Sequence, residues 1–170
     1  MKIPFLILIP LAFSAAQSQT AAVNPHLLKE VRHELVMLPD VSIFDNLEFR
    51  VDGNTVTLMG QVSRPIIKSE AENVTKHVEG VGQVVNQIEV LPLSPMDDQI
   101  RRATYSALVR QPQLQRYFMQ SLAPIRIIVK NGNVTLEGVV SDKADSDVAK
   151  ITANSVSGAF GVTNNLRVEK

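Results

Sequence analysis

The stretch VKNGNVTLEGVV at residues 129–140 repeats, with substitutions, the stretch VDGNTVTLMGQV at residues 51–62. In both stretches, apolar and polar residues alternate on either side of a glycine-containing turn, which is typical of a β-hairpin. The turn pair is Asn-Gly in the later copy and Asp-Gly in the earlier one, and these residues tolerate a positive φ. The two hairpins indicate that one small fold occurs twice in this chain.

The repeat extends well beyond the hairpins. With a shift of 78 positions, residues 51–90 align with residues 129–168 without a gap, and 13 positions are identical. The identical positions, named in the earlier copy, are Val51, Val56, Thr57, Leu58, Gly60, Val62, Ser63, Ala71, Val78, Gly80, Val84, Asn86 and Val90. These residues are small, apolar or turn-forming, so the repeat describes a fold and not a reaction.

The pattern of each copy predicts the order helix, strand, strand, helix, strand. Asn24 and Asp97 are expected to cap the first helix of each copy, and Ser63 and Ser141 the second helix. Apolar faces on three strands and two helices predict a two-layer sandwich. The expected fold class is therefore α+β: two tandem α-β-β-α-β two-layer sandwich domains, each a three-stranded mixed sheet with two helices.

Two repeated residue pairs interrupt the apolar inner faces of the predicted strands. Gly60 and Gly138 are expected where a helix crosses the sheet closely, because such a crossing leaves no room for a side chain. Asn86 and Asn164 carry amides that must find hydrogen-bond partners among valines. Two readings of these amides stay open: a tie from the strand to a neighbouring loop, or a contact with a ligand.

The beginning of the chain predicts export. Residues 1–18 contain a weakly basic start, a short apolar run and small residues, which is the order of a cleaved signal peptide. The apolar run is far shorter than the ~20 residues that span a bilayer. The first domain is expected at residues 24–92 and the second at residues 96–170, with a short proline-bounded linker between them.

The chain contains no cysteine. We therefore expect no disulfide and no acylated N-terminal cysteine, and two small domains that depend on core packing alone. We expect a soluble, periplasmic or secreted bacterial protein that is not a lipoprotein. Val148 and Ile151 replace Glu70 and Asn73 of the earlier copy, so we also expect this helix face to pack against the other domain or a partner chain.

The pattern Val-x-x-Gly-x-Val-Thr-Leu-x-Gly-x-Val at residues 129–140, continued through Gly158 to Val168, resembles the BON domain. This family is named for bacterial osmotically induced periplasmic and nodulation-related proteins. Residues 56–62 and 80–90 match the pattern in the earlier copy. The resemblance implies tandem BON domains, similar to osmotically inducible periplasmic proteins. It also implies a non-enzymatic envelope module associated with phospholipid surfaces and with envelope or osmotic stress.

The residues do not assemble into a recognisable reactive site. The chain has three histidines, His26, His33 and His77, which form no histidine cluster, and without a cysteine either, a structural zinc site is not expected. A helix cap explains Ser63 and Ser141 without a catalytic role. No phosphate-binding glycine loop or aromatic stripe suggests a nucleotide or nucleic acid. We expect no enzyme activity, no cofactor, no metal and no nucleic-acid partner.

The two copies differ in charge, although the whole chain has a net charge of zero. Residues 23–92 contain six basic and ten acidic residues, whereas residues 93–170 contain ten basic and seven acidic residues. The predicted lipid- or partner-binding residues of the later copy are Arg102, Arg110, Arg116, Tyr117 and Phe118. Basic residues beside aromatic ones suit an anionic membrane surface. The alternative is that Phe118 and Leu122 close the local core and that the arginines are simply solvated.

The function expected from these features is an exported, non-catalytic envelope binding module that associates with phospholipid surfaces or envelope components. The alternative is a periplasmic protein–protein adaptor, or an osmotic or envelope stress protein without direct lipid binding. Anionic membrane surfaces and envelope proteins are thus the two expected classes of partner.

Overall fold

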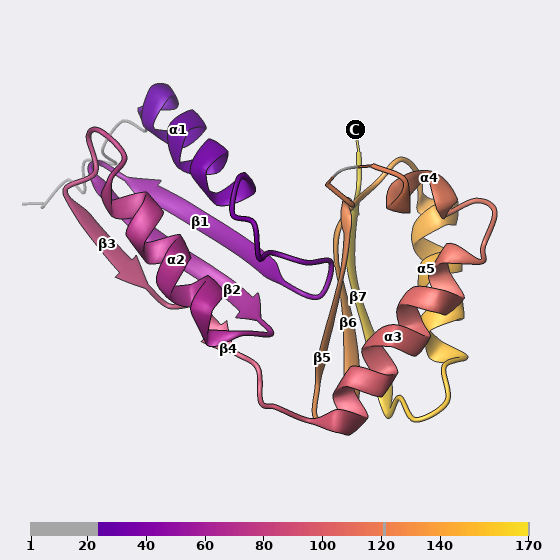
Figure 1. The fold of residues 1–170 in the computed structure, drawn as a ribbon. Coiled ribbons are helices and arrows are strands. Elements are labelled where there is room, and N and C mark those ends of the chain that lie inside the picture. The colour runs from indigo at the N-terminus through magenta and orange to yellow at the C-terminus, as the bar shows by residue number, and fades with distance from the viewer. Residues whose placement is uncertain (1–23, 121, 170) are drawn as a thin grey trace, which may run out of the picture.

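The computed structural model describes residues 24–120 and 122–169. The predicted signal peptide at residues 1–18 lies outside the described residues. Figure 1 shows two α/β units that stand side by side, joined by a short segment between β4 and α3. We call residues 24–92 domain one and residues 93–169 domain two. Within these residues, no helix is both long and apolar enough to span a membrane.

Domain one has the predicted order of elements, with its last strand in two pieces. Its elements are α1 (Pro25–Val36), β1 (Asn46–Asp52), β2 (Thr55–Val62), α2 (Pro65–Lys76), β3 (Gln83–Asn86) and β4 (Glu89–Val90). β1 pairs antiparallel with β2, and both β3 and β4 pair parallel with β2. The sheet is therefore mixed, as predicted, and α1 and α2 pack against it over a buried aliphatic core.

Domain two repeats this arrangement and adds one short helix. Its elements are α3 (Pro95–Val109), α4 (Gln115–Phe118), β5 (Ile125–Lys130), β6 (Asn133–Val140), α5 (Lys143–Asn154) and β7 (Gly161–Val168). β5 is antiparallel and β7 is parallel to β6. The sheet has a core of its own, to which the added segment contributes Leu114 and Tyr117. The prediction of two tandem α+β sandwiches is thus confirmed.

The helix caps follow the prediction in α1 and depart from it elsewhere. The Asn24 side chain accepts hydrogen bonds from the amides of His26 and Leu27, so Asn24 caps α1 as expected. The cap of α3 is Ser94, and the prediction of Asp97 is wrong. The caps of α2 and α5 are Arg64 and Asp142, one residue after the predicted serines.

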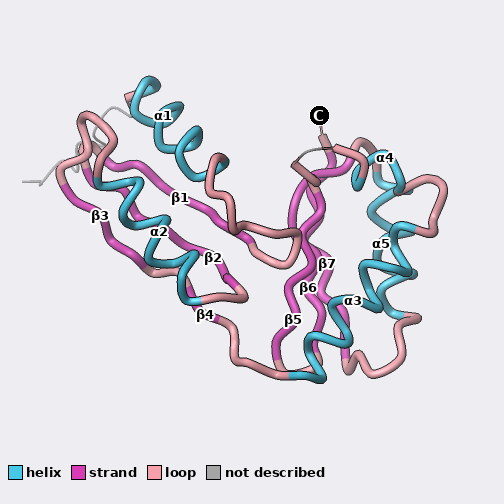
Figure 2. Tube along the Cα trace, viewed as in Figure 1, coloured by secondary structure: helices cyan, strands magenta, loops and turns pink. Residues whose placement is uncertain are grey.

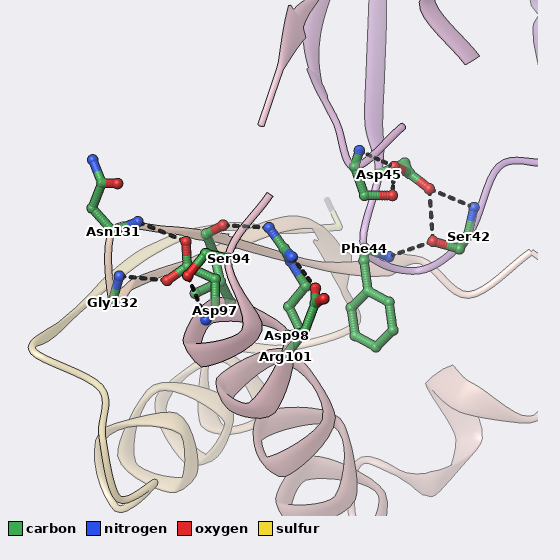
Figure 3. A network of polar contacts seen from close by, with 11 residues as sticks. Ser42, Phe44, Asp45, Ser94, Asp97, Asp98, Arg101, Asn131 and Gly132 are labelled. Carbon is green, nitrogen blue, oxygen red and sulfur yellow. Dashed lines mark hydrogen bonds and ion pairs between the residues drawn. The ribbon is translucent and has the colours of Figure 1, made fainter. Parts of the chain in front are cut away.

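Asp97 is buried and serves the neighbouring hairpin. Its carboxylate accepts hydrogen bonds from the amides of Asn131 at 3.0 Å and Gly132 at 2.7 Å (Figure 3). Both turn residues have a positive φ, 51° and 76°, as the Asn-Gly pair predicts. One buried carboxylate therefore holds the tip of the β5–β6 hairpin against the start of α3.

Gly60 and Gly138 have φ values of 105° and 124°, a region that side chains disfavour. A Cβ atom at either position would also collide with a backbone carbonyl of the adjacent chain segment, that of Asn46 or Pro124. The expectation of a closely crossing helix is therefore wrong. These glycines are required by their own backbone conformation and by a neighbouring backbone.

The two domains meet through the segment between α1 and β1, which we call the junction segment (residues 38–45). Figure 2 shows this segment as a loop that reaches the edge of the β5–β6–β7 sheet. The Ile43 carbonyl accepts a hydrogen bond of 2.9 Å from the amide of Ile127, in the edge strand β5. Ile43 and Phe44 pack against the core of domain two, and the Phe44 ring meets the Tyr105 ring edge-on.

Candidate binding surfaces

Arg102 lies in α3, Arg110 is the C-cap of the same helix about two turns further on, and both side chains are exposed. Within the described residues, neither guanidinium makes a hydrogen bond or an ion pair. Figure 1 shows α3 and α5 on the face of the domain-two sheet that is turned away from domain one. Both side chains are exposed, so their charges are available to a partner.

Arg116 and Tyr117 belong to an internal polar network. The Tyr117 hydroxyl donates to the carboxylate of Asp145 and accepts from the amide of Ser141 at 2.8 Å and from Arg116 at 3.0 Å. Arg116 also pairs with Asp145, and more distantly with Asp142. The hydrogen bonds to Tyr117 and Asp145 raise the pKa of Arg116 above its ordinary value. The charge of Arg116 is thus largely offset by its own domain.

The two aromatic residues of the predicted surface point into the protein. Tyr117 is only 4% exposed and belongs to the core of domain two. Phe118 is half-buried, and its ring meets the Tyr105 ring edge-on at 5.7 Å. Tyr105 in turn contacts Phe44 of domain one. The structure therefore separates the predicted set into an exposed pair on α3 and a group that stabilises domain two and the domain junction.

A groove of about 1130 Å³ between the domains was not predicted. Domain one lines it with parts of α1, the junction segment and β1. Domain two lines it with Tyr105 of α3, Phe118 of α4, the segment before β5 and the outer face of its sheet. The lining includes Leu35, Val36, Leu47, Phe49, Leu122, Arg32, Arg126 and Arg167. The sequence contains one hint of this groove, because Ile43-Phe44 is an apolar pair outside any predicted element.

Charged groups meet across the domain boundary beside this groove. The Arg126 side chain donates a hydrogen bond of 3.1 Å to the carbonyl of Ser42. Burial lowers the pKa of Arg126, and the nearby carboxylate of Asp45 opposes this change. Asp45 is fully buried and accepts hydrogen bonds from Ser42 (Figure 3). It also accepts hydrogen bonds from Ser63. Asp45 thus fixes the junction segment to the start of α2.

The remaining polar residues considered as ligand-binding or catalytic candidates make hydrogen bonds within the fold. The amide and hydroxyl of Ser63 both donate to Asp45. The Asn86 amide donates to the Lys68 carbonyl, and its oxygen accepts from the amide of Ile88. Asn164 makes the equivalent bonds to Ser146 and Leu166. Each asparagine therefore ties the last strand to the preceding helix, where a loop was predicted.

A smaller pocket of about 460 Å³ lies between α1 and α2 and contains His26 and His77 together with glutamates. His77 is already engaged, because its Nδ1 lies 2.7 Å from the carbonyl of Asn73. In the part of the chain that the structure describes, no three metal-ligating side chains lie close enough together to hold an ion.

The BON domain family matches the chain twice, over residues 25–92 and 96–170. The chain belongs to the BON domain family. Both BON domains have the mixed sheet and paired helices described above, and the domain-two hairpin carries the pattern that suggested the family. Membership in this family fits an envelope-associated, non-catalytic role.

One curated relative is osmotically-inducible protein Y of Escherichia coli (strain K12). It is 25% identical over 142 residues, which cover 82% of this BON protein and 67% of the relative. Among solved structures, the C-terminal domain of CdsD, the structural protein of the Type III secretion system of Chlamydia trachomatis, matches with 12% identity. That match covers 87% of this chain and 100% of the other, and its TM-score of 0.31 is too low to support a conclusion about function.

Proposed function

We propose that this protein is an exported, non-catalytic module of the bacterial envelope that associates with anionic phospholipid surfaces through α3. The observation that carries the proposal is the pair Arg102, in α3, and Arg110, its C-cap, which are both exposed and form no ion pair among the described residues. Domain two is the basic half of the chain, so an anionic surface attracts it and repels domain one.

The charges of α3 suit transient binding. Each basic residue near an anionic leaflet contributes about 1 kcal/mol, so two arginines contribute about 2 kcal/mol, or roughly 30-fold in affinity. Arg116 adds less, because Asp145 and Asp142 already offset its charge. Tyr117 and Phe118 are left out of the proposed surface, since their rings are taken up by contacts inside the protein.

The export part of the proposal rests on residues 1–18. Mass spectrometry of the protein recovered from the cell envelope is expected to find a chain that begins near residues 16–18. A protein that retains Met1 would contradict export by a cleaved signal.

Sedimentation with lipid vesicles tests the membrane part. The double variant Arg102→Glu/Arg110→Glu is expected to lose binding to anionic vesicles, whereas Lys29→Glu/Lys68→Glu in domain one is expected to retain it. If the unmodified protein does not bind such vesicles, the adaptor function is favoured instead. The groove between the domains is the observation that supports that second candidate.

A further inference from the structure

The edge of β5 shows how this fold accepts an added chain segment. β5 is the edge strand of the domain-two sheet, and its inner neighbour is β6. The amide of Ile127 points away from β6 and donates to the carbonyl of Ile43 in the junction segment. Phe44, the next residue, packs against the core beneath this edge. One backbone hydrogen bond and an adjacent apolar side chain therefore seat the junction segment on β5.

The edge of β1 is the equivalent place in domain one. Phe49 lies opposite Leu58 in β2, in the register that places Ile127 opposite Leu136 in β6. Backbone groups alternate in direction along an antiparallel pair, so the amide of Phe49 also points away from its neighbour. Among the described residues, β1 pairs with β2 alone. Its outer row of N–H and C=O groups is therefore unpaired.

The side chains at the two edges differ in burial. Ile125 and Ile127 in β5 are fully buried, whereas their equivalents Leu47 and Phe49 in β1 are only half-buried. The longer connection in domain two explains the difference, because it supplies α4 and its buried Tyr117 to cover the sheet. Domain one has no counterpart of α4 in its shorter connection, so apolar surface beside the β1 edge stays partly uncovered.

The groove between the domains runs along this open edge. Residues 46–49 of β1 line it, with Leu35 and Val36 of α1 beside them and Leu122 of domain two on the other side. Its volume of about 1130 Å³ exceeds the range of roughly 300–1,000 Å³ that holds one small ligand. An unpaired strand edge next to apolar side chains is complementary to an occupant with backbone donors, backbone acceptors and apolar side chains. A lipid chain supplies apolar groups but no backbone donors or acceptors.

We propose that the β1 edge binds an extended peptide segment of a partner protein by strand addition. The backbone of the peptide pairs with the outward groups of β1, and its apolar side chains lie over Leu47 and Phe49. The junction segment on β5 is the internal example of such an occupant. This site lies in domain one and is independent of the lipid surface proposed for α3.

A peptide with the sequence of residues 38–46, LPDVSIFDN, is the probe, because it contains the segment that seats on β5. It is titrated into the isotope-labelled mature chain and followed by NMR. We expect chemical-shift changes centred on residues 47–51 and slower hydrogen exchange at the amide of Phe49. The variant Phe49→Lys is expected to weaken binding at least tenfold, whereas Ile66→Lys on the exposed part of α2 is expected to leave it unchanged.

Modified peptides keep the test decisive if Phe49→Lys does not fold. One peptide is N-methylated at the residues equivalent to Ser42 and Phe44, and another at those equivalent to Val41 and Ile43. Strand addition uses alternate amides, so one peptide is expected to bind at least tenfold more weakly than the other.

Three results would overturn the proposal. The first is equal binding of the two methylated peptides, or no binding at millimolar concentration. The second is a set of shift changes confined to β5 around Ile127, which would mean that the probe only replaces the junction segment. The third is self-association of the chain that Phe49→Lys abolishes, which would assign the edge to a second copy.

Discussion

The carbonyl of Ile43 accepts a hydrogen bond of 2.9 Å from the amide of Ile127, and this bond joins two residues in different domains. Phe44, the residue after Ile43, contacts Tyr105, and a separate ion pair links Glu89 of domain one to Lys130 of domain two. Domains of this size are marginally stable alone, and this chain has no disulfide to support them. The junction therefore stabilises each domain by covering part of the other.

Phe44→Ala tests that stabilisation. Loss of a half-buried ring at the junction is expected to lower the free energy of unfolding by about 1–3 kcal/mol, measured by urea denaturation. Small-angle X-ray scattering is expected to show a larger radius of gyration as the domains separate. Met37→Ala is the matched control, because Met37 precedes the junction segment and is 64% exposed. Equal effects of the two substitutions would show that the junction contributes nothing specific.

Tyr117→Phe removes one hydroxyl from the network around Asp145. The amide of Ser141 and the buried carboxylate each lose a hydrogen bond, so we expect destabilisation by about 1–3 kcal/mol. The control is Tyr105→Phe, because the Tyr105 hydroxyl makes no hydrogen bond within the described residues. If thermal denaturation shows the same change in melting temperature for both variants, the network does not contribute to stability.

Asp97→Ala removes the carboxylate that holds the Asn131-Gly132 turn. The buried amide of Gly132 and the part-buried amide of Asn131 lose their acceptor, so the free energy of unfolding is expected to fall by about 2–3 kcal/mol. Asp147→Ala removes an exposed partner of Lys143 on α5 and is expected to cost less than about 0.5 kcal/mol. Hydrogen exchange at Asn131 and Gly132 is expected to accelerate in the first variant alone, and unchanged exchange there would contradict this role of Asp97.

Glu72 makes stability depend on pH in the acid range. Hydrogen bonds from Lys76 and then from Asn86 lower the pKa of Glu72 below its ordinary value of 4.5. A carboxylate whose pKa is lower in the folded state than in the unfolded state stabilises the protein fully at pH values above the unfolded-state pKa. This stabilisation is lost as pH falls through the folded-state pKa. Melting temperatures from about pH 6 down to about pH 3 are therefore expected to fall less steeply for Glu72→Gln than for the unmodified protein.

Lys76→Gln is expected to flatten the same pH profile, because Lys76 makes the largest contribution to the shift. Glu79→Gln is the control, since Glu79 is exposed and has no ion pair within the described part of the chain. A profile that only Glu79→Gln changes would show that Glu72 has no part in acid unfolding.

The architecture was predictable because its signals are local. Alternation of apolar residues and the Asn-Gly pair specify the β5–β6 hairpin within twelve residues, and the repeat confirms the reading in domain one. The caps of α2 and α3 were not predictable from local pattern. Ser63 donates a hydrogen bond to Asp45, 18 residues earlier in the chain. Asp97 accepts a hydrogen bond from a turn residue 34 positions later.

The surfaces were predicted less well, because burial depends on contacts distant in sequence. The spacing of Arg102 and Arg110 predicts that both lie along α3 and its C-cap. No pattern in the neighbouring sequence shows that Arg116 and Tyr117 hydrogen-bond to Asp145. The Val148 and Ile151 face was expected to pack against the other domain or a partner chain; packing against domain one is wrong, and a partner chain stays a prediction. Val148 packs against the core of domain two, and Ile151 is 69% exposed. The real junction uses Ile43 and Ile127, 84 residues apart.

Co-sedimentation with vesicles at two salt concentrations tests the central claim most directly. The unmodified mature protein is expected to bind anionic vesicles more than zwitterionic ones, and to bind less at about 300 mM than at about 50 mM salt. Arg102→Glu/Arg110→Glu is expected to abolish the binding, while Lys29→Glu/Lys68→Glu preserves it. Arg116 stays unchanged, because a glutamate beside Asp145 would destabilise domain two. Equal loss in both double variants, or no preference for anionic vesicles, would contradict lipid association through α3.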